Sequence, residues 1–169
     1  MKNKVKPIYK ILLIINLLLS SGGQMFGQEK ATISAGIGFP DLINIGIKYQ
    51  VFNQAQIGLN IGYFPPFGGT GILTWGNLYS LSGDFYYHFA GSSEFSKMHP
   101  WYGRLGLNSF NGTGVEGSLD SNIRIGRDCY ITKTCGISLE AGLMCHFNYK
   151  EYHNNMFEPS LGIYFFYRF

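Results

Sequence analysis

Hydrophobic and polar residues alternate with a period of two along most of the chain beyond residue 28. Odd-numbered positions carry large apolar or aromatic side chains, and the even-numbered positions between them are small or polar. The segment 43–51, with isoleucine at positions 43, 45 and 47, shows the pattern clearly. Because successive side chains of a β-strand point to opposite faces, the alternation predicts strands with one apolar and one polar face.

Turn residues divide this alternation into eight predicted strands. The strands cover approximately residues 30–38, 42–52, 55–64, 74–89, 99–110, 115–127, 134–149 and 158–169. Such strands, each of about ten residues, fill the chain beyond residue 28 once their connections are included. The pattern predicts an all-β fold, an eight-stranded antiparallel up-and-down barrel. The even number of strands brings both termini to one end.

The odd phase continues across every predicted turn. Residues paired on one face then differ by an even number, so each connection needs an odd number of residues or a compensating bulge. The pair Asn111-Gly112 resembles a two-residue turn, but parity predicts that it belongs to a connection of three or five residues. Exposed connections are expected at 39–41, 65–73, 111–114 and 150–157.

Two arrangements fit the alternation: a water-soluble barrel with the apolar face inside, and a transmembrane barrel with that face outside. Most glycines in the predicted strands are even-numbered, as the crowded interior of a narrow barrel requires. The strand charges are almost all even-numbered as well, and charge is costly on a lipid-facing surface but tolerable when paired in a lumen. These charges form a predicted lumen ion network of Lys48, Asp84, Arg104, Glu116, Asp120, Arg124, Glu140, Glu158 and Arg168. The distribution favours the transmembrane arrangement.

The composition agrees with a chain that has much apolar surface to place. Of the 169 residues, 46% are hydrophobic, 17% aromatic and only 14% charged, whereas a soluble domain is about 25% charged. This excludes a disordered chain. Aromatic residues gather where the predicted strands end, at two levels, as expected for the two interfaces of a membrane.

The N-terminal segment 1–28 has the layout of a secretory signal peptide, with cleavage between about 23 and 28. A basic region with Lys2, Lys4, Lys6 and Lys10 precedes an apolar core at 11–19 and a small polar stretch at 20–23. That core is too short for a membrane-anchoring helix, which needs about 20 apolar residues. Removing the four lysines leaves nine basic against ten acidic residues, a net charge of −1 for 29–169, so no electrostatic case for a nucleic-acid partner remains.

The last strand ends the chain in alternating large residues: Leu161, Ile163, Phe165, Tyr167 and Phe169. This pattern is similar to the carboxy-terminal assembly signal of bacterial outer-membrane proteins. With the export signal and the strand count, residues 29–169 resemble the small OmpA/OmpX-type barrels without a periplasmic domain. The resemblance implies the bacterial outer membrane as location, with its lipids and the barrel-assembly machinery as partners, and a monomer.

Candidate chemistry is sparse. Ser82, Asp84 and His88 share the even face of one predicted strand, and Glu140 and His146 share that of another, so a Ser-His-acid hydrolase is one interpretation of these residues. A lumen closed to acyl chains favours hydrogen bonding instead. No metal or cofactor site is expected. Cys129 and Cys135 flank a turn and form either a disulfide or two free thiols, with a lipid-facing thiol predicted at Cys145.

The sequence therefore predicts an outer-membrane barrel with a structural or surface-interaction role and no catalysis. Two alternatives stay open from the residues alone. One is a lipid-modifying barrel enzyme, an acyl hydrolase or transferase. The other is a narrow pore lined by the lumen charges, although an eight-stranded barrel leaves an interior just wide enough for side chains.

Overall fold

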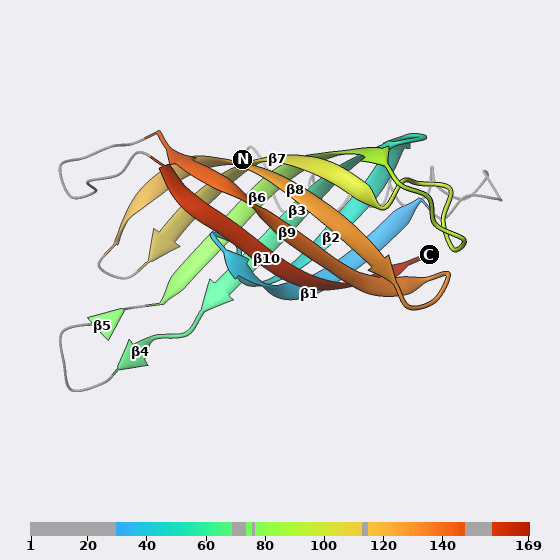
Figure 1. The fold of residues 1–169 in the computed structure, drawn as a ribbon. Coiled ribbons are helices and arrows are strands. Elements are labelled where there is room, and N and C mark those ends of the chain that lie inside the picture. Colours follow the sequence, from blue (N-terminus) through green and yellow to red (C-terminus); the bar gives the residue numbers. More distant parts are fainter. Residues whose placement is uncertain (1–29, 69–73, 76, 113–114, 148–156) are drawn as a thin grey trace, which may run out of the picture.

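Eight antiparallel strands close into a barrel (Figure 1) in the computed structural model, which describes residues 30–68, 74–75, 77–112, 115–147 and 157–169. The order around the barrel is β1-β10-β9-β8-β7-β6-β3-β2. The bounds are β1 Ala31–Phe39, β2 Leu42–Phe52, β3 Ala55–Phe64, β6 Leu78–Ala90, β7 Trp101–Gly112, β8 Val115–Tyr130, β9 Cys135–His146 and β10 Phe157–Arg168. Each barrel strand pairs with the next one along the chain and β1 closes on β10, which confirms the predicted fold class. The described residues include no helix long and apolar enough to cross a bilayer.

A small hairpin outside the barrel corrects the predicted start of the fourth strand. That strand was expected from residue 74, but β6 begins at Leu78, where it pairs with Phe64 of β3. Residues 74–75 instead form β5 (Thr74–Trp75), which pairs with β4 (Phe67–Gly68) in a separate sheet beyond the ends of β3 and β6 (Figure 1). Prolines 65 and 66 separate β3 from β4, and because proline has no N–H to donate, they end the barrel ladder there.

The two ends of the barrel differ in their connections. Backbone hydrogen bonds join Ala31 and Phe169 at one end, here called the terminal end, where the strands are linked by 53–54, 91–100 and 131–134. The opposite end carries the links 40–41 and 113–114, the β4–β5 hairpin and the link from β9 to β10.

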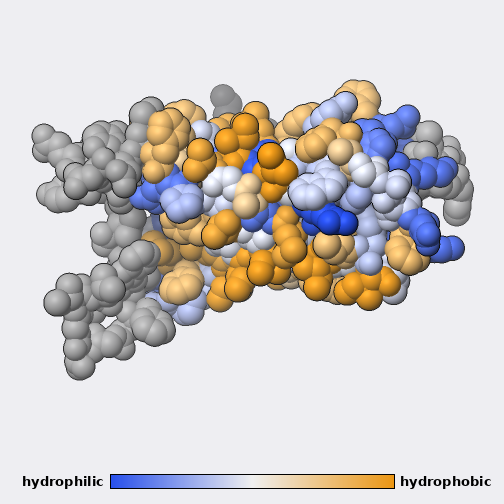
Figure 2. All heavy atoms as spheres, in the orientation of Figure 1, coloured by the Kyte–Doolittle hydropathy of each residue, from blue (hydrophilic) through white to orange (hydrophobic). Residues whose placement is uncertain are grey.

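Side chains follow the predicted parity in all eight barrel strands, apart from a few positions at strand ends. Odd-numbered residues face outward: Ile45 is 67% exposed, Leu107 54% and Leu143 52%. Even-numbered residues face inward and are mostly buried. Figure 2 shows apolar side chains covering the middle of the barrel, with hydrophilic ones gathered toward the terminal end. The barrel therefore has an apolar exterior and a polar interior, which excludes the soluble arrangement with its apolar face inside.

Bulges accommodate three of the connections that have an even number of residues, whereas no register shift lies beside the links 40–41 and 131–134. Register shifts lie beside the two-residue links 53–54 and 113–114, and beside the ten-residue link 91–100. The expectation for Asn111-Gly112 was wrong. These residues end β7, only two residues separate them from β8, and the shift between Phe110 and Gly112 restores the parity.

Inward-facing glycines make room for large inward side chains on neighbouring positions. A Cβ at Gly126 would overlap the Tyr102 ring, and one at Gly162 would overlap Tyr164. At Gly106 it would collide with the carboxylate of Asp84. The glycine-rich even face thus allows a narrow lumen to hold bulky charged and aromatic groups at close-packed density.

Placing a charge on the outward face should destabilise the barrel in a depth-dependent way. Ile123→Arg, at the middle of β8, is expected to cost about 2–4 kcal/mol of unfolding free energy in lipid vesicles, because the guanidinium would lie in hydrocarbon. The control Phe89→Arg, at the end of β6, should cost only about 0–1 kcal/mol. Denaturant titrations of folded protein measure both values, and equal costs would contradict the assigned membrane depth.

Candidate functional site

The middle of the lumen is crossed by a buried group of five charged side chains, here called the central ion cluster. It consists of Asp41, Asp84, Arg104, Arg124 and Glu140, and every one of these side chains is at most 2% exposed. The two guanidiniums come from the adjacent strands β7 and β8, where Arg104 and Arg124 are register partners. Like charges so close together require carboxylates around them, and the cluster supplies three.

Arg104 lies at the centre of this cluster. Its Nε donates to Asp84 Oδ1 at 2.8 Å, and its Nη1 lies 2.9 Å from Asp41 Oδ2 and 2.7 Å from Glu140 Oε2. Asp84 is further held by Asn60, whose Nδ2 donates to Oδ2 at 2.6 Å. Ion pairs buried this deeply are sustained only when the remaining lone pairs are also satisfied, as they are here.

Arg124 shares two of these carboxylates and adds contacts to β10. Its Nη1 lies 2.6 Å from Asp41 Oδ2 and 3.0 Å from Glu140 Oε2. The same nitrogen donates to the Tyr164 hydroxyl at 2.8 Å, and Nε donates to Ser160 Oγ at 2.5 Å. The cluster consequently ties β6, β7, β8, β9 and β10 together across the lumen.

Asp41 was not among the predicted site residues, and its placement corrects the expectation that 39–41 is an exposed connection. The turn 40–41 folds into the barrel mouth, where the Asp41 carboxylate accepts from Tyr164 at 2.6 Å and its carbonyl accepts from Ser80 at 3.2 Å. Burial alone would raise the pKa of the Asp41 carboxyl, but the guanidiniums of Arg104 and Arg124 outweigh that effect and hold the pKa below its usual value. The carboxylate is therefore ionised and belongs to the lumen.

The other predicted network residues fall into separate groups. Asp120 accepts from His146 Nδ1 at 2.7 Å, and Glu158 lies 3.6 Å from the other ring nitrogen, toward the opposite end of the barrel. The strands on either side of Arg104 each carry an inward carboxylate, Asp84 on β6 and Asp120 on β8, and Arg104 pairs with Asp84 and not with Asp120. Between this group and the cluster, the buried amides of Asn108 and Asn122 have no hydrogen-bond partner among the described residues.

Toward the terminal end the lumen is filled by aromatic rings. Tyr86, Tyr102, His88 and Phe166 are all at most 1% exposed. The Tyr102 ring lies 5.7 Å from that of Tyr86 and 5.0 Å from that of His88, and its hydroxyl donates to Glu140 at 2.8 Å. Lys48 reaches this layer, with its ammonium 4.4 Å from the centre of the Tyr86 ring. This is a cation–π arrangement.

The segment 91–100, which links β6 to β7, covers the lumen between these rings and the terminal end of the barrel. Met98 is 4% exposed, and Ser96 accepts a hydrogen bond from Arg168 Nη1 at 2.7 Å. The carbonyl of His99 accepts from His88 at 2.6 Å. Arg168 also lies 3.9 Å from Asp128, an inward carboxylate that the predicted network missed because the sixth strand was expected to end at residue 127. The side chain of Glu116 lies outside the described part of the chain.

The Ser-His-acid arrangement is not assembled. Ser82 donates to Asp84 at 2.9 Å, while the two ring nitrogens of His88 contact the His99 carbonyl and Gln56. Among the described residues, no three His, Cys, Asp or Glu side chains are grouped to hold a metal ion. Cys129 and Cys135 are free thiols, with Cys129 paired to Ile137 across the strands, and Cys145 is free as well.

Fold and interior together define a small up-and-down barrel of the transmembrane class, with a filled lumen and an apolar exterior. No family model and no curated protein matches the sequence. The structure is similar to the N-terminal β-barrel domain of OprF from Pseudomonas aeruginosa, with a TM-score of 0.58 and 22% sequence identity over 85% of this chain and 99% of that one. This likeness confirms the predicted OmpA-type barrel fold.

The pairing of Arg104 with Asp84 is testable by a double-mutant cycle. Arg104→Met should cost about 3–5 kcal/mol of unfolding free energy, because it leaves buried carboxylates without their cation. Adding Asp84→Asn should then cost less than its effect alone, with a coupling of about 0.5–3 kcal/mol.

Asp120→Asn is the matched control, since Asp120 is equally buried but pairs with His146. Its effect should add to that of Arg104→Met within about 0.5 kcal/mol. Additive behaviour of both pairs would argue against the described cluster.

Proposed function

We propose that the chain is a bacterial outer-membrane barrel that serves as a closed, non-catalytic scaffold and presents its opposite-end connections at the cell surface. The observation that carries this proposal is the central ion cluster together with the aromatic layer below it. These groups occupy the cross-section of the lumen and bind to one another rather than lining an open path. The interior of an eight-stranded barrel is just wide enough for side chains to fill it.

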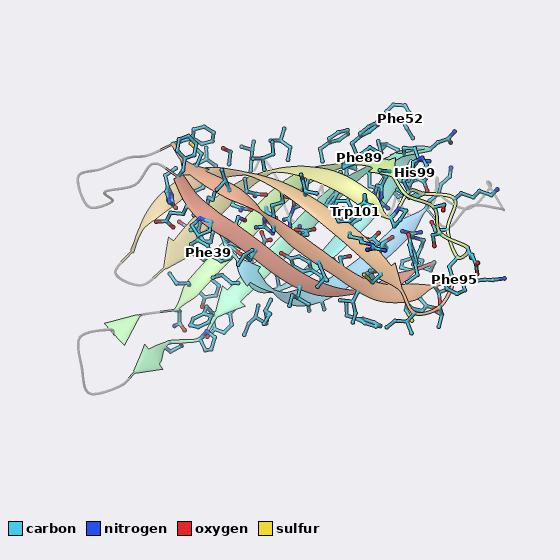
Figure 3. The ribbon with its side chains drawn as sticks, viewed as in Figure 1. Phe39, Phe52, Phe89, Phe95, His99 and Trp101 are labelled. Atoms are coloured by element: carbon cyan, nitrogen blue, oxygen red, sulfur yellow. The ribbon has the colours of Figure 1, made fainter. Side chains whose placement is uncertain are left out.

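The apolar side chains on the outer surface of the barrel support its insertion in a membrane. Large apolar side chains such as Ile61, 68% exposed, and Ile123, 63% exposed, recur on every barrel strand. A continuous apolar surface of this kind would aggregate in water, but it fits the hydrocarbon of a bilayer. Aromatic residues such as Phe52, Phe89 and Trp101 lie toward the terminal end, and Phe39 lies toward the other (Figure 3), in the positions of interfacial belts.

The outer membrane is the proposed location because of the features at both ends of the sequence. Residues 1–28 lie outside the described part of the chain, and their signal-peptide pattern remains a prediction. The C-terminal signal residues Leu161, Ile163, Phe165, Tyr167 and Phe169 all lie on the outward face, 49–59% exposed. A machinery that reads an exposed alternating strand could recognise them during assembly, with the terminal end in the periplasm.

A surface role follows from this orientation. The β4–β5 hairpin and the neighbouring connections then face the exterior, where loops carried on a rigid scaffold commonly bind partners. Catalysis is not part of the proposal, because Asp84 is engaged by Arg104 and His88 does not contact Ser82.

Planar-bilayer recordings distinguish the scaffold from a narrow pore. The purified barrel, whose folded state is first checked by heat-modifiable gel mobility, should produce no steady conductance steps, since buried ion pairs and rings fill its lumen. Reproducible unitary steps from the folded protein would contradict the closed scaffold and favour the pore. A gel band that does not shift on heating would contradict the membrane barrel itself.

The proposed orientation predicts which connections are accessible on intact cells. An epitope inserted between residues 70 and 71, in the β4–β5 connection, should be labelled by antibody without permeabilisation. The same epitope in the 131–134 turn should be labelled only after the outer membrane is opened. The reverse pattern would overturn the orientation.

A further inference from the structure

One charged residue departs from the apolar exterior. Arg127, on β8, is the one charged residue that the described strands place on the outward face, and it is exposed. It is three residues from the end of β8 at Tyr130, near the terminal end of the barrel. A charge on the lipid-facing surface is unfavourable at mid-depth and tolerated near the headgroups, so this position suits an interfacial role.

Arg127 is held against an aromatic ring rather than a carboxylate. Its register partner is Trp101, and the guanidinium carbon lies 5.4 Å from the centre of the Trp101 ring. The neighbouring Asp128 faces the lumen, where its carboxylate accepts from Ser138 at 2.6 Å. No carboxylate of the described residues forms an ion pair with Arg127. Its positive charge is thus positioned by Trp101 and is not neutralised by any carboxylate in the described part of the chain.

A recess lies beside this pair on the same outward face. Gly103 follows Trp101 by two residues on β7 and is flanked by its register partners Tyr87 and Ile125, which are 55% and 59% exposed. A Cβ at Gly103 would meet no atom within 4 Å. The outward surface is therefore dented between two projecting apolar side chains, next to a fixed positive charge.

We propose that Arg127, Trp101 and Gly103 form a binding site for an anionic glycerophospholipid in the leaflet at the terminal end of the barrel. The guanidinium binds the lipid phosphate, for which its planar pair of donors is well suited. The Trp101 ring lies at the interface, and an acyl chain occupies the recess at Gly103. The inference rests on the proposed function in one respect, which is that the barrel is inserted in a membrane.

Fluorescence quenching by brominated lipids tests the site directly. The chain has two tryptophans, so Trp75→Phe leaves Trp101 as the single reporter. The full protein with this change is reconstituted into phosphatidylcholine vesicles that contain brominated phosphatidylglycerol or brominated phosphatidylcholine. Trp101 should be quenched by both lipids, with an approximately fivefold preference for phosphatidylglycerol, the ratio expected for one interfacial positive charge.

Variants of the protein test whether Arg127 causes the preference for phosphatidylglycerol. Arg127→Gln should abolish it, and Arg127→Lys should retain most of it because the charge remains. Lys133→Gln is the matched control: it removes an exposed positive charge from the 131–134 turn at the same end and should leave the preference unchanged. Gly103→Leu should lower the quenching of Trp101 by both brominated lipids, because a side chain in the recess displaces the acyl chain that the two lipids have in common.

The outcomes separate this proposal from the proposed function. Equal quenching by the two lipids, or a preference that survives Arg127→Gln, would overturn the lipid site while leaving the inserted barrel intact. No quenching by either lipid would instead contradict membrane insertion. Excess inorganic phosphate should not reduce the preference, and if it did, the site would be one for free anions and the lipid assignment would be wrong.

Discussion

Two buried guanidiniums at the same level of a narrow lumen set the main constraint on this protein. Arg104 and Arg124 are register partners on the adjacent strands β7 and β8, and neither could be buried without carboxylates in contact with it. Asp84 and Glu140 come from the adjoining strands, and the third carboxylate comes from the turn 40–41, which is drawn into the mouth of the barrel. The position of that turn is a consequence of the charge in the lumen.

The rest of the architecture fits around this cluster. The inward glycines provide the space that large charged and aromatic side chains need, and buried aromatic rings fill the lumen between Arg104 and the terminal end. The exterior is the inverse of a soluble protein, with isoleucine, leucine and aromatic residues outside and the ion pairs inside. Such an arrangement is stable only where the surroundings are apolar, so the filled lumen and the proposed membrane location have the same physical cause.

Parity was sufficient to predict the strands and their faces, because the alternation of a β-strand is a local property that the sequence records at every position. The alternation does not indicate how far along the barrel axis an inward side chain lies. Arg104 lies between β6 and β8, and the choice of Asp84 over Asp120 depends on the strand register that closes the barrel, which is a global property. Asp41 was missed for a similar reason: a turn residue has no strand face, so nothing local indicates that it points inward. The β4–β5 hairpin escaped prediction because its residues continue the apolar pattern beyond the point where Pro65 and Pro66 end the ladder.

Proton exchange at the arginine side chains distinguishes a lumen that is closed by buried ion pairs from one that is open to water. Nuclear magnetic resonance of the folded protein in detergent micelles at neutral pH can follow each Nε–H separately, with assignments from Arg104→Met, Arg124→Met and Arg127→Gln. With a closed lumen, we expect slowly exchanging, resolved Nε–H signals for Arg104 and Arg124, whose side chains are at most 2% exposed, and rapid exchange for Arg127 on the exterior. Rapid exchange at Arg104 and Arg124, equal to that of Arg127, would show that water passes through the lumen and that the ion pairs do not close it.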